Sequence, residues 1–325
     1  MGPRQMTTWP SGTNMPIEMT LTPPAPTGGI IPCLGEAELE ARAQFIEKLR
    51  AETEDGTYPA SVLSRKELEG MLPKVPFGPE VSGGIWSDMD GYVDPLHLMF
   101  AFRKSFVRLG GTLFAGERVS EVKPSGKGYT VVCGGRTLEC GKAVLAAGLG
   151  VRKLAAQLGT DIPVFPNKSQ VMLLERIPAD VLPIPLLGIA RTFGGTVMIG
   201  AAHENMGMDR RLTPEVLAAN AQWAVRVWPE LERKRILRFW TGLRVWPKDA
   251  YPIYDRIPGH ENAFVFAMHS AVSLAAILEQ ALPDYVMGKP LPPDGAIFGL
   301  SRFAGGGSGF QGSAASSPHA EAPNK

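Results

Sequence analysis

The sequence predicts a mixed α/β (α+β) fold in which two kinds of sheet alternate along the chain. Residues 263–268, AFVFAM, form a short apolar run typical of a strand covered on both faces, and a helix-forming segment follows it directly. Residues 162–201 are instead rich in short strands, which indicates an antiparallel or mixed sheet. At 325 residues, the chain is long enough for two domains or two interleaved lobes.

Composition excludes several classes of protein. The chain is 44% hydrophobic and 20% charged with a net charge of +1, so we expect no nucleic-acid partner and no attraction to an anionic membrane. No apolar run reaches the ~18 residues of a membrane helix, and prolines break the N-terminal segment, which therefore does not resemble a secretory signal. Cys33, Cys133 and Cys140 lack metal-ligand spacing, which predicts no metal site and a cytoplasmic, reducing location.

The first third of the chain predicts an irregular start followed by capped helices. Residues 1–27 are rich in Pro, Thr and Met without a period, so we expect them to be irregular or disordered. A short strand is expected at 28–32 and an amphipathic helix at 36–52. Ser64 and Glu67 form a capping box that starts a short helix.

A second well-capped helix is expected from Asp94, the N-cap, and Pro95, the first helical residue, to about Leu109. Gly110 and Gly111 should end it. The residues expected to face inward are Leu96, Met99, Phe100, Phe106 and Val107.

The middle of the chain predicts strands, the last of which ends in small residues. Strands are expected at 112–115, 119–122, 129–133 and 142–146. The small residues Ala146-Ala147-Gly148 at the end of the last strand would let a ligand approach the backbone closely. Gly148-Leu149-Gly150 is not a phosphate loop, because the sixth position of that motif is Lys153.

The remaining segments predict a helix at 214–227, a strand at 236–245 and a disordered tail. The strand carries Arg244 between the apolar residues Leu243 and Val245, so Arg244 faces the opposite side with Gly242 and Trp246. The Gly-, Ser- and Ala-rich residues 304–325 are expected to be disordered.

Several motifs resemble the D-amino-acid oxidase and glycine oxidase superfamily of flavoproteins. The H-S-x-V-x-L-A-A pattern is most similar to the flavin subunits of opine oxidase, hydrogen cyanide synthase and D-hydroxyproline dehydrogenase. The matching segments are Leu63–Leu68, Asp90–Pro95, Gly242-Leu243-Arg244, Asp249–Tyr254, Met268–Ala275 and the closing Phe298-x-x-x-Arg302-Phe303.

The resemblance implies an FAD-binding Rossmann-like domain interleaved with a substrate domain. It places residues 28–91 and 163–245 in the substrate domain and residues 92–162 and 246–303 in the FAD-binding domain. The family begins with a β-α-β unit carrying G-x-G-x-x-G, which needs roughly 30 residues. The substrate-domain pattern already begins at Gly28, so we expect the FAD-binding domain of this sequence to be incomplete.

The resemblance also implies a reaction. The family oxidises the C–N bond of a small amino acid or amine by hydride transfer to FAD, and the substrate here would be a D-amino acid, glycine, hydroxyproline or an opine. Partner subunits of a hetero-oligomeric dehydrogenase are a further implication. The alternative is a truncated, non-catalytic homologue that serves as a scaffold or subunit-contact protein.

The implied site residues divide into catalytic and cofactor-binding groups. Arg244 matches the arginine that holds the substrate carboxylate. Tyr251 and Tyr254 would either line the pocket or belong to the core, and Tyr251 is counted here with the catalytic group. The backbone N–H groups of the turn after residue 268 would stabilise negative charge on the flavin. Ala271 stands where the family usually has Gly, and His269 is expected to be a hydrogen-bonded turn residue rather than a catalyst. The implied cofactor-binding residues are Val119, Ala146, Ala147, Gly148, Gly242, His269, Ser270, Ala271, Val272 and Ser273.

Overall fold

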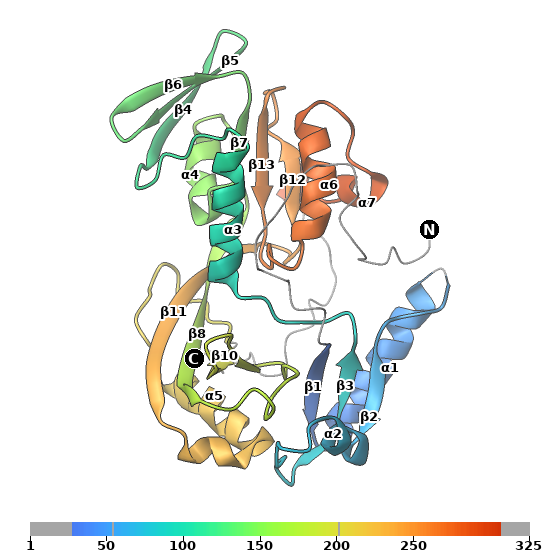
Figure 1. The fold of residues 1–325 in the computed structure, drawn as a ribbon. Coiled ribbons are helices and arrows are strands. Elements are labelled where there is room, and N and C mark those ends of the chain that lie inside the picture. Colours follow the sequence, from blue (N-terminus) through green and yellow to red (C-terminus); the bar gives the residue numbers. More distant parts are fainter. Residues whose placement is uncertain (1–27, 54, 201, 307–325) are drawn as a thin grey trace. The chain divides into compact units, whose positions relative to one another are not determined.

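A computed structural model describes residues 28–53, 55–200 and 202–306, and these fall into two compact units. The chain passes back and forth between the units, so each is built from separate segments (Figure 1). The first comprises the described parts of Met1–Thr112, Gln170–Ala201 and Leu212–Trp240. The second comprises those of Leu113–Ser169, Ala202–Arg211 and Thr241–Lys325. The mixture of helices and sheets confirms the predicted fold class.

The first unit begins with an antiparallel sheet in the order β1-β3-β2 (Gly29–Leu34, Val81–Ser87, Ser61–Ser64). Helix α1 (Glu36–Glu52) has the predicted bounds. Helix α2 (Arg65–Met71) begins at the predicted capping box: Ser64 Oγ accepts from the Glu67 N–H, and the Glu67 carboxylate accepts from the Ser64 N–H at 2.8 Å.

A four-stranded sheet has the order β11-β8-β10-β9. Its strands are β8 (Val164–Arg176), β9 (Ile189–Arg191), β10 (Thr196–Gly200) and β11 (Ile236–Pro247). Strand β8 is a continuous strand of 13 residues in a segment that was predicted to contain short strands. Residues of β9 and β10 pack with helix α5 (Pro214–Val227), the short helix η2 (Pro229–Arg233) and the fully buried Trp228 to form the core of the first unit.

The second unit is organised around a sheet in the order β12-β13-β7. Strand β13 (Ala263–Ala267) runs parallel to β7 (Ala143–Leu145) and antiparallel to β12 (Ile253–Arg256). Residues 263–265 are at most 1% exposed, which confirms the buried strand predicted from the apolar run. The short helix η1 (Gly148–Gly150) and helix α4 (Val151–Ala156) follow β7, and α4 contributes to the same core.

A separate antiparallel sheet contains β4 (Val119–Ser125), β5 (Gly128–Cys133) and β6 (Arg136–Cys140) in that order. Strand β6 was not predicted. It follows a two-residue turn in which Gly134 and Gly135 have φ values of 55° and 83°, the backbone of a tight hairpin.

The C-terminal part of the second unit contains α6 (Ala275–Val286), α7 (Pro293–Ala296) and the short helix η3 (Leu300–Gly306). Residues 304–306 therefore belong to a helical turn, which corrects the predicted start of the disordered tail. The rest of that tail and the predicted irregular segment 1–27 lie outside the described residues.

Two predictions near helix α3 (Pro95–Arg108) are wrong. Asp94 caps the helix as predicted, through Oδ1 to the N–H groups of Leu96 and His97, but the helix has no buried residue. Leu96, Met99 and Phe100 are 68%, 64% and 64% exposed, so the face that was expected to point inward is not buried. Residues 112–115 form no strand; they lie between positive-φ glycines at 110 and 116.

Within the described ranges, every helix is too short or too polar to span a bilayer. The same ranges hold no cluster of three or more His, Cys, Asp or Glu side chains placed to bind a metal ion.

Candidate functional site

The carboxyl ends of β7 and β13 meet at one edge of the sheet in the second unit. Leu145 pairs with Val265 in parallel register, so the segments that follow both strands leave the sheet on the same side. Ala146 and Ala147 are exposed there, and Gly148 adopts a φ of 56°. In open α/β sheets, ligands bind outside this end of the strands.

The turn after β13 departs from the prediction of a helix that starts directly off the strand. Helix α6 begins only at Ala275, after one turn in which the Leu274 N–H donates to the Ser270 carbonyl at 3.1 Å. Ser270, with φ 55°, carries the left-handed conformation, whereas Ala271 does not. The methyl group of Ala271 is therefore compatible with the turn.

This turn carries three consecutive backbone N–H groups that can bind a ligand. The N–H groups of Ala271, Val272 and Ser273 donate no hydrogen bond to any described residue, and all three residues are exposed. Unpaired N–H groups that precede a helix carry a partial positive charge.

Arg244, on β11, has only neutral partners. Its Nη1 lies 3.3 Å from Nε2 of His203, and its Nη2 donates to Oγ of Ser169 at 3.2 Å. Burial lowers the pKa of the Arg244 guanidinium, which nevertheless stays charged at neutral pH. Among the described residues, no carboxylate lies within ion-pair distance of Arg244. The site thus contains a partly buried cation that has no counter-ion in the described part of the chain.

A row of aromatic rings connects Arg244 to the turn after β13. The His203 ring meets Trp246 edge-on at 5.1 Å, and Trp246 stacks on His269 at 4.4 Å and 14°. His269 Nε2 contacts the Ala250 carbonyl, and its Nδ1 contacts Ser270 Oγ at 2.7 Å. Both nitrogens of His269 are therefore occupied, as expected of a hydrogen-bonded turn residue.

The other predicted site residues lie in varied surroundings. A Cβ atom added to Gly148 would lie 3.5 Å from Val245, the neighbour of Arg244 in β11. Gly242 is exposed and open around its Cα, and Val119 begins β4 in the separate β4-β5-β6 sheet. Tyr251 stacks on Phe298 at 6.3 Å, and no hydrogen bond joins it to Arg244.

An ion pair that the sequence did not predict fixes the turn beside His269. Arg302 Nε donates to Asp249 at 2.7 Å, and the two side chains are 9% and 0% exposed. The same guanidinium also donates to the carbonyls of Tyr251 and Pro252 at 3.2 and 2.9 Å. The sequence signal that could have revealed this ion pair is the Phe298-x-x-x-Arg302 motif. In the structure, Arg302 Nη1 donates to the Phe298 carbonyl, so the two motif residues are in contact.

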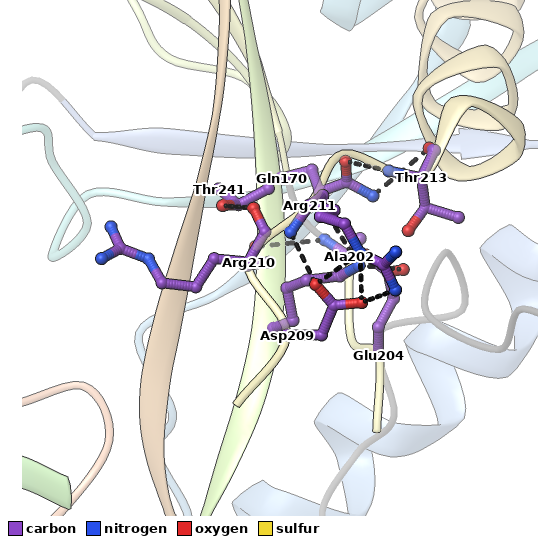
Figure 2. A network of polar contacts seen from close by, with 10 residues as sticks. Gln170, Ala202, Glu204, Asp209, Arg210, Arg211, Thr213 and Thr241 are labelled. Atoms are coloured by element: carbon purple, nitrogen blue, oxygen red, sulfur yellow. Dashed lines mark hydrogen bonds and ion pairs between the residues drawn. The ribbon is translucent and has the colours of Figure 1, made fainter. Parts of the chain in front are cut away.

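A second buried ion pair holds the segment that carries His203. Lys168 and Glu204, 1% and 6% exposed, lie 3.1 Å apart, and their backbones exchange two hydrogen bonds. Figure 2 shows Glu204 near the Asp209–Arg211 pair, and the Thr241 hydroxyl donating to the Arg210 carbonyl at 2.7 Å. In the first unit, the Thr213 N–H donates to Oε1 of Gln170 at 2.9 Å, and Nε2 of Gln170 donates to the Thr213 carbonyl at 3.4 Å.

The sequence of this chain matches a known family. Residues 18–278 match the family model described as FAD dependent oxidoreductase (DAO). The chain belongs to this family. Its members are enzymes whose cofactor is FAD, which confirms the resemblance, the enzyme prediction and the cofactor prediction.

Individual proteins of this family are similar over most of the chain. The B subunit of opine oxidase from Agrobacterium tumefaciens is 31% identical over 83% of this chain and 72% of its own length. The HcnC subunit of hydrogen cyanide synthase from Pseudomonas aeruginosa is 29% identical over 80% of this chain and 64% of its own. Glycine oxidase of Geobacillus kaustophilus is 24% identical over 76% and 67%, respectively.

Solved structures share the fold of this family member. Glycine oxidase from Geobacillus kaustophilus superimposes with a TM-score of 0.76 at 23% identity, over 85% of this chain and 74% of the other. L-proline dehydrogenase from P. horikoshii gives a TM-score of 0.76 at 21% identity, over 87% and 78%. These similarities support the mixed fold described above.

Proposed function

We propose that this chain oxidises the C–N bond of a small amine that carries a carboxylate, namely a D-amino acid, glycine, hydroxyproline or an opine. One observation carries the proposal: the partly buried guanidinium of Arg244 contacts only neutral groups among the described residues. A cation removed from water is costly unless an anion pairs with it. A substrate carboxylate would supply that anion and could accept two parallel N–H bonds.

The site residues also suit the family's cofactor. FAD, when bound, supplies the hydride acceptor. Ala146, Ala147 and Gly148 would let it approach the end of β7. The N–H groups of residues 271–273, which donate to no described residue, would stabilise negative charge on it. Ser270, His269, Gly242 and Val119 keep their proposed cofactor roles, and Tyr251 its proposed role in the pocket.

We further propose that the chain works as one subunit of a hetero-oligomeric dehydrogenase. Two relatives are named as subunits of an oxidase and of a synthase, and the exposed apolar residues of α3 are suited to a protein contact. Native purification from the natural host should yield a second polypeptide that co-elutes with this chain. A catalytically active, flavin-bearing monomer would contradict this part of the proposal.

Replacement of Arg244 tests the carboxylate role. We expect Arg244→Ala to raise KM for the substrate by roughly 10- to 150-fold, because a charge-assisted hydrogen bond contributes about 1.5–3 kcal/mol. Arg244→Lys should recover only part of this, because an ammonium group lacks the planar fork of a guanidinium. Arg238→Ala, at an exposed arginine of the same strand, is the matched control and should leave KM unchanged.

A visible absorption spectrum must come first, with and without added FAD. A flavin band that travels with each variant allows its KM to be read as a substrate effect. If the flavin-loaded Arg244→Ala variant binds substrate like the original protein, the carboxylate role is wrong.

A further inference from the structure

The contact between Arg244 and His203 determines which nitrogen of the imidazole carries the proton. An arginine side chain can only donate hydrogen bonds, so Nε2 of His203, 3.3 Å from Arg244 Nη1, must be the acceptor. The proton of a neutral ring then lies on Nδ1, which is 3.0 Å from Oδ1 of Asn167. Asn167 can accept it there, because its Nδ2 donates to Asn205 at 3.3 Å.

We infer that His203 is a positioning residue that holds Arg244 in its carboxylate-binding pose only while its own ring is neutral. This inference rests on the proposed carboxylate role of Arg244. A guanidinium has five N–H groups, and His203 and Ser169 take one each, which leaves three for a ligand. The two neutral partners orient the cation without cancelling its charge.

The surroundings of His203 favour the neutral ring. Burial lowers the pKa of His203 from 6.5, and the positive charges of Arg244 and His269 lower it further. Asn167 and Trp246 face the ring as uncharged groups. The adjacent carboxylate, that of Glu204, is paired with Lys168.

Protonation would therefore disturb the site in two ways. It would remove the Nε2 acceptor and place a second positive charge beside the guanidinium of Arg244. The folded protein disfavours the protonated ring, so this change begins only below the ordinary pH range of a histidine. We expect KM for a carboxylate substrate to rise as the pH falls below 6.5. Above pH 6.5, His203 should make no contribution to the pH dependence of KM.

Nitrogen NMR of the 15N-histidine-labelled full-length chain tests the proton assignment without measuring activity. The chain has five histidines, and the signal lost in His203→Gln identifies His203. We expect the Nδ1–H tautomer and a pKa below 6.5, with the pKa rising in Arg244→Ala because both the charge and the donor are removed. An Nε2–H tautomer, or a signal indifferent to Arg244→Ala, would overturn the inference.

Two substitutions test the positioning role in the flavin-loaded protein. His203→Gln retains an amide oxygen that can accept from Arg244 at every pH, so KM should stay near the original value and lose its rise below pH 6.5. His203→Leu offers no acceptor, so KM should rise several-fold at all pH values while kcat changes less. A His203→Leu variant with the original KM and pH profile would overturn the positioning role.

The two failures can be told apart. If the proposed function is wrong, Arg244→Ala leaves KM unchanged even though the NMR signal of His203 responds to it. If only the present inference is wrong, Arg244→Ala still raises KM, whereas His203→Leu behaves like the original protein.

Discussion

At the scale of single residues, the site contains backbone strain at two non-glycine positions. Ala250 and Ser270 have φ values of 66° and 55°, a region that residues with a side chain rarely adopt. The two residues are linked, because His269 contacts both the Ala250 carbonyl and the Ser270 hydroxyl. The strain therefore lies in the turns that orient the aromatic row.

We expect Ala250→Gly to stabilise the protein. Relief of the left-handed alanine is worth about 1–2 kcal/mol, and the greater freedom of glycine in the unfolded chain offsets about half of it. The free energy of unfolding should rise by about 0.5–1 kcal/mol in a urea titration. Ala147→Gly is the matched control: Ala147 has φ −92°, so glycine should destabilise there. A loss of stability in Ala250→Gly would contradict this account.

Asn167→Asp should change the titration of His203. The new carboxylate would lie beside Nδ1, now 3.0 Å from the amide oxygen, and would favour the protonated ring. We expect the pKa of His203 to rise and carboxylate binding to weaken at a higher pH than in the original protein. The NMR titration described above measures the shift, and a pKa that stays or falls would contradict the assigned hydrogen bond.

At the scale of elements, helix α3 differs from the other helices with hydrophobic faces. Helix α5 buries Leu217, Ala224 and Val227, whereas α3 has no buried residue. A side-chain cap from Asp94 starts α3, and a proline occupies the first turn of both helices, so local signals define both, but burial depends on what covers the helix. The apolar face of α3 therefore contributes little to the stability of the described chain.

Two phenylalanines provide a test of that conclusion. Phe100, 64% exposed on α3, should tolerate replacement by alanine within about 0.5 kcal/mol. Phe264, 1% exposed on β13, should lose about 3–5 kcal/mol on the same change. Urea denaturation of the two variants measures both values. A similar loss at both positions would mean that the α3 face is covered in solution.

At the scale of the whole molecule, buried ion pairs connect segments that are far apart in the chain. Asp249 and Arg302 are 53 residues apart in the sequence. Arg302 also donates to the carbonyl of Tyr251, near Asp249, and to that of Phe298, near Arg302 itself. Lys168 and Glu204 make a similar buried pair. Such pairs specify which segments meet, and removal of one partner leaves the other charge buried and unpaired.

Arg302→Met should therefore be strongly destabilising. We expect a loss of about 3–5 kcal/mol in the free energy of unfolding, because the carboxylate of Asp249 is 0% exposed. Arg152→Met removes an arginine from an exposed pair with Asp161, 49% and 67% exposed, and should cost only about 0–1 kcal/mol. Calorimetry or chemical denaturation compares the two, and equal losses would argue against a special role for Arg302.

The sequence by itself determined the fold class, the family and those local elements that periodicity and capping encode. Helix α1 and the caps at Ser64 and Asp94 are encoded within a few neighbouring residues, so periodicity and capping rules predict them. Arg244 could be selected as well, because a motif and the alternation of the strand both identify it. The false strand at 112–115 and the missed strand β6 arose where turn glycines, rather than side-chain pattern, control the backbone.

Only the tertiary structure decided what surrounds Arg244. His203 and Ser169 lie 41 and 75 residues before it in the sequence. Trp246 links the two histidines only because the fold brings both the His203 ring and the His269 ring into contact with it. The same holds for α3, whose apolar residues look like core residues until their coverage is known. Contacts of this kind depend on strand pairing and chain crossing over long separations, which local sequence signals do not specify.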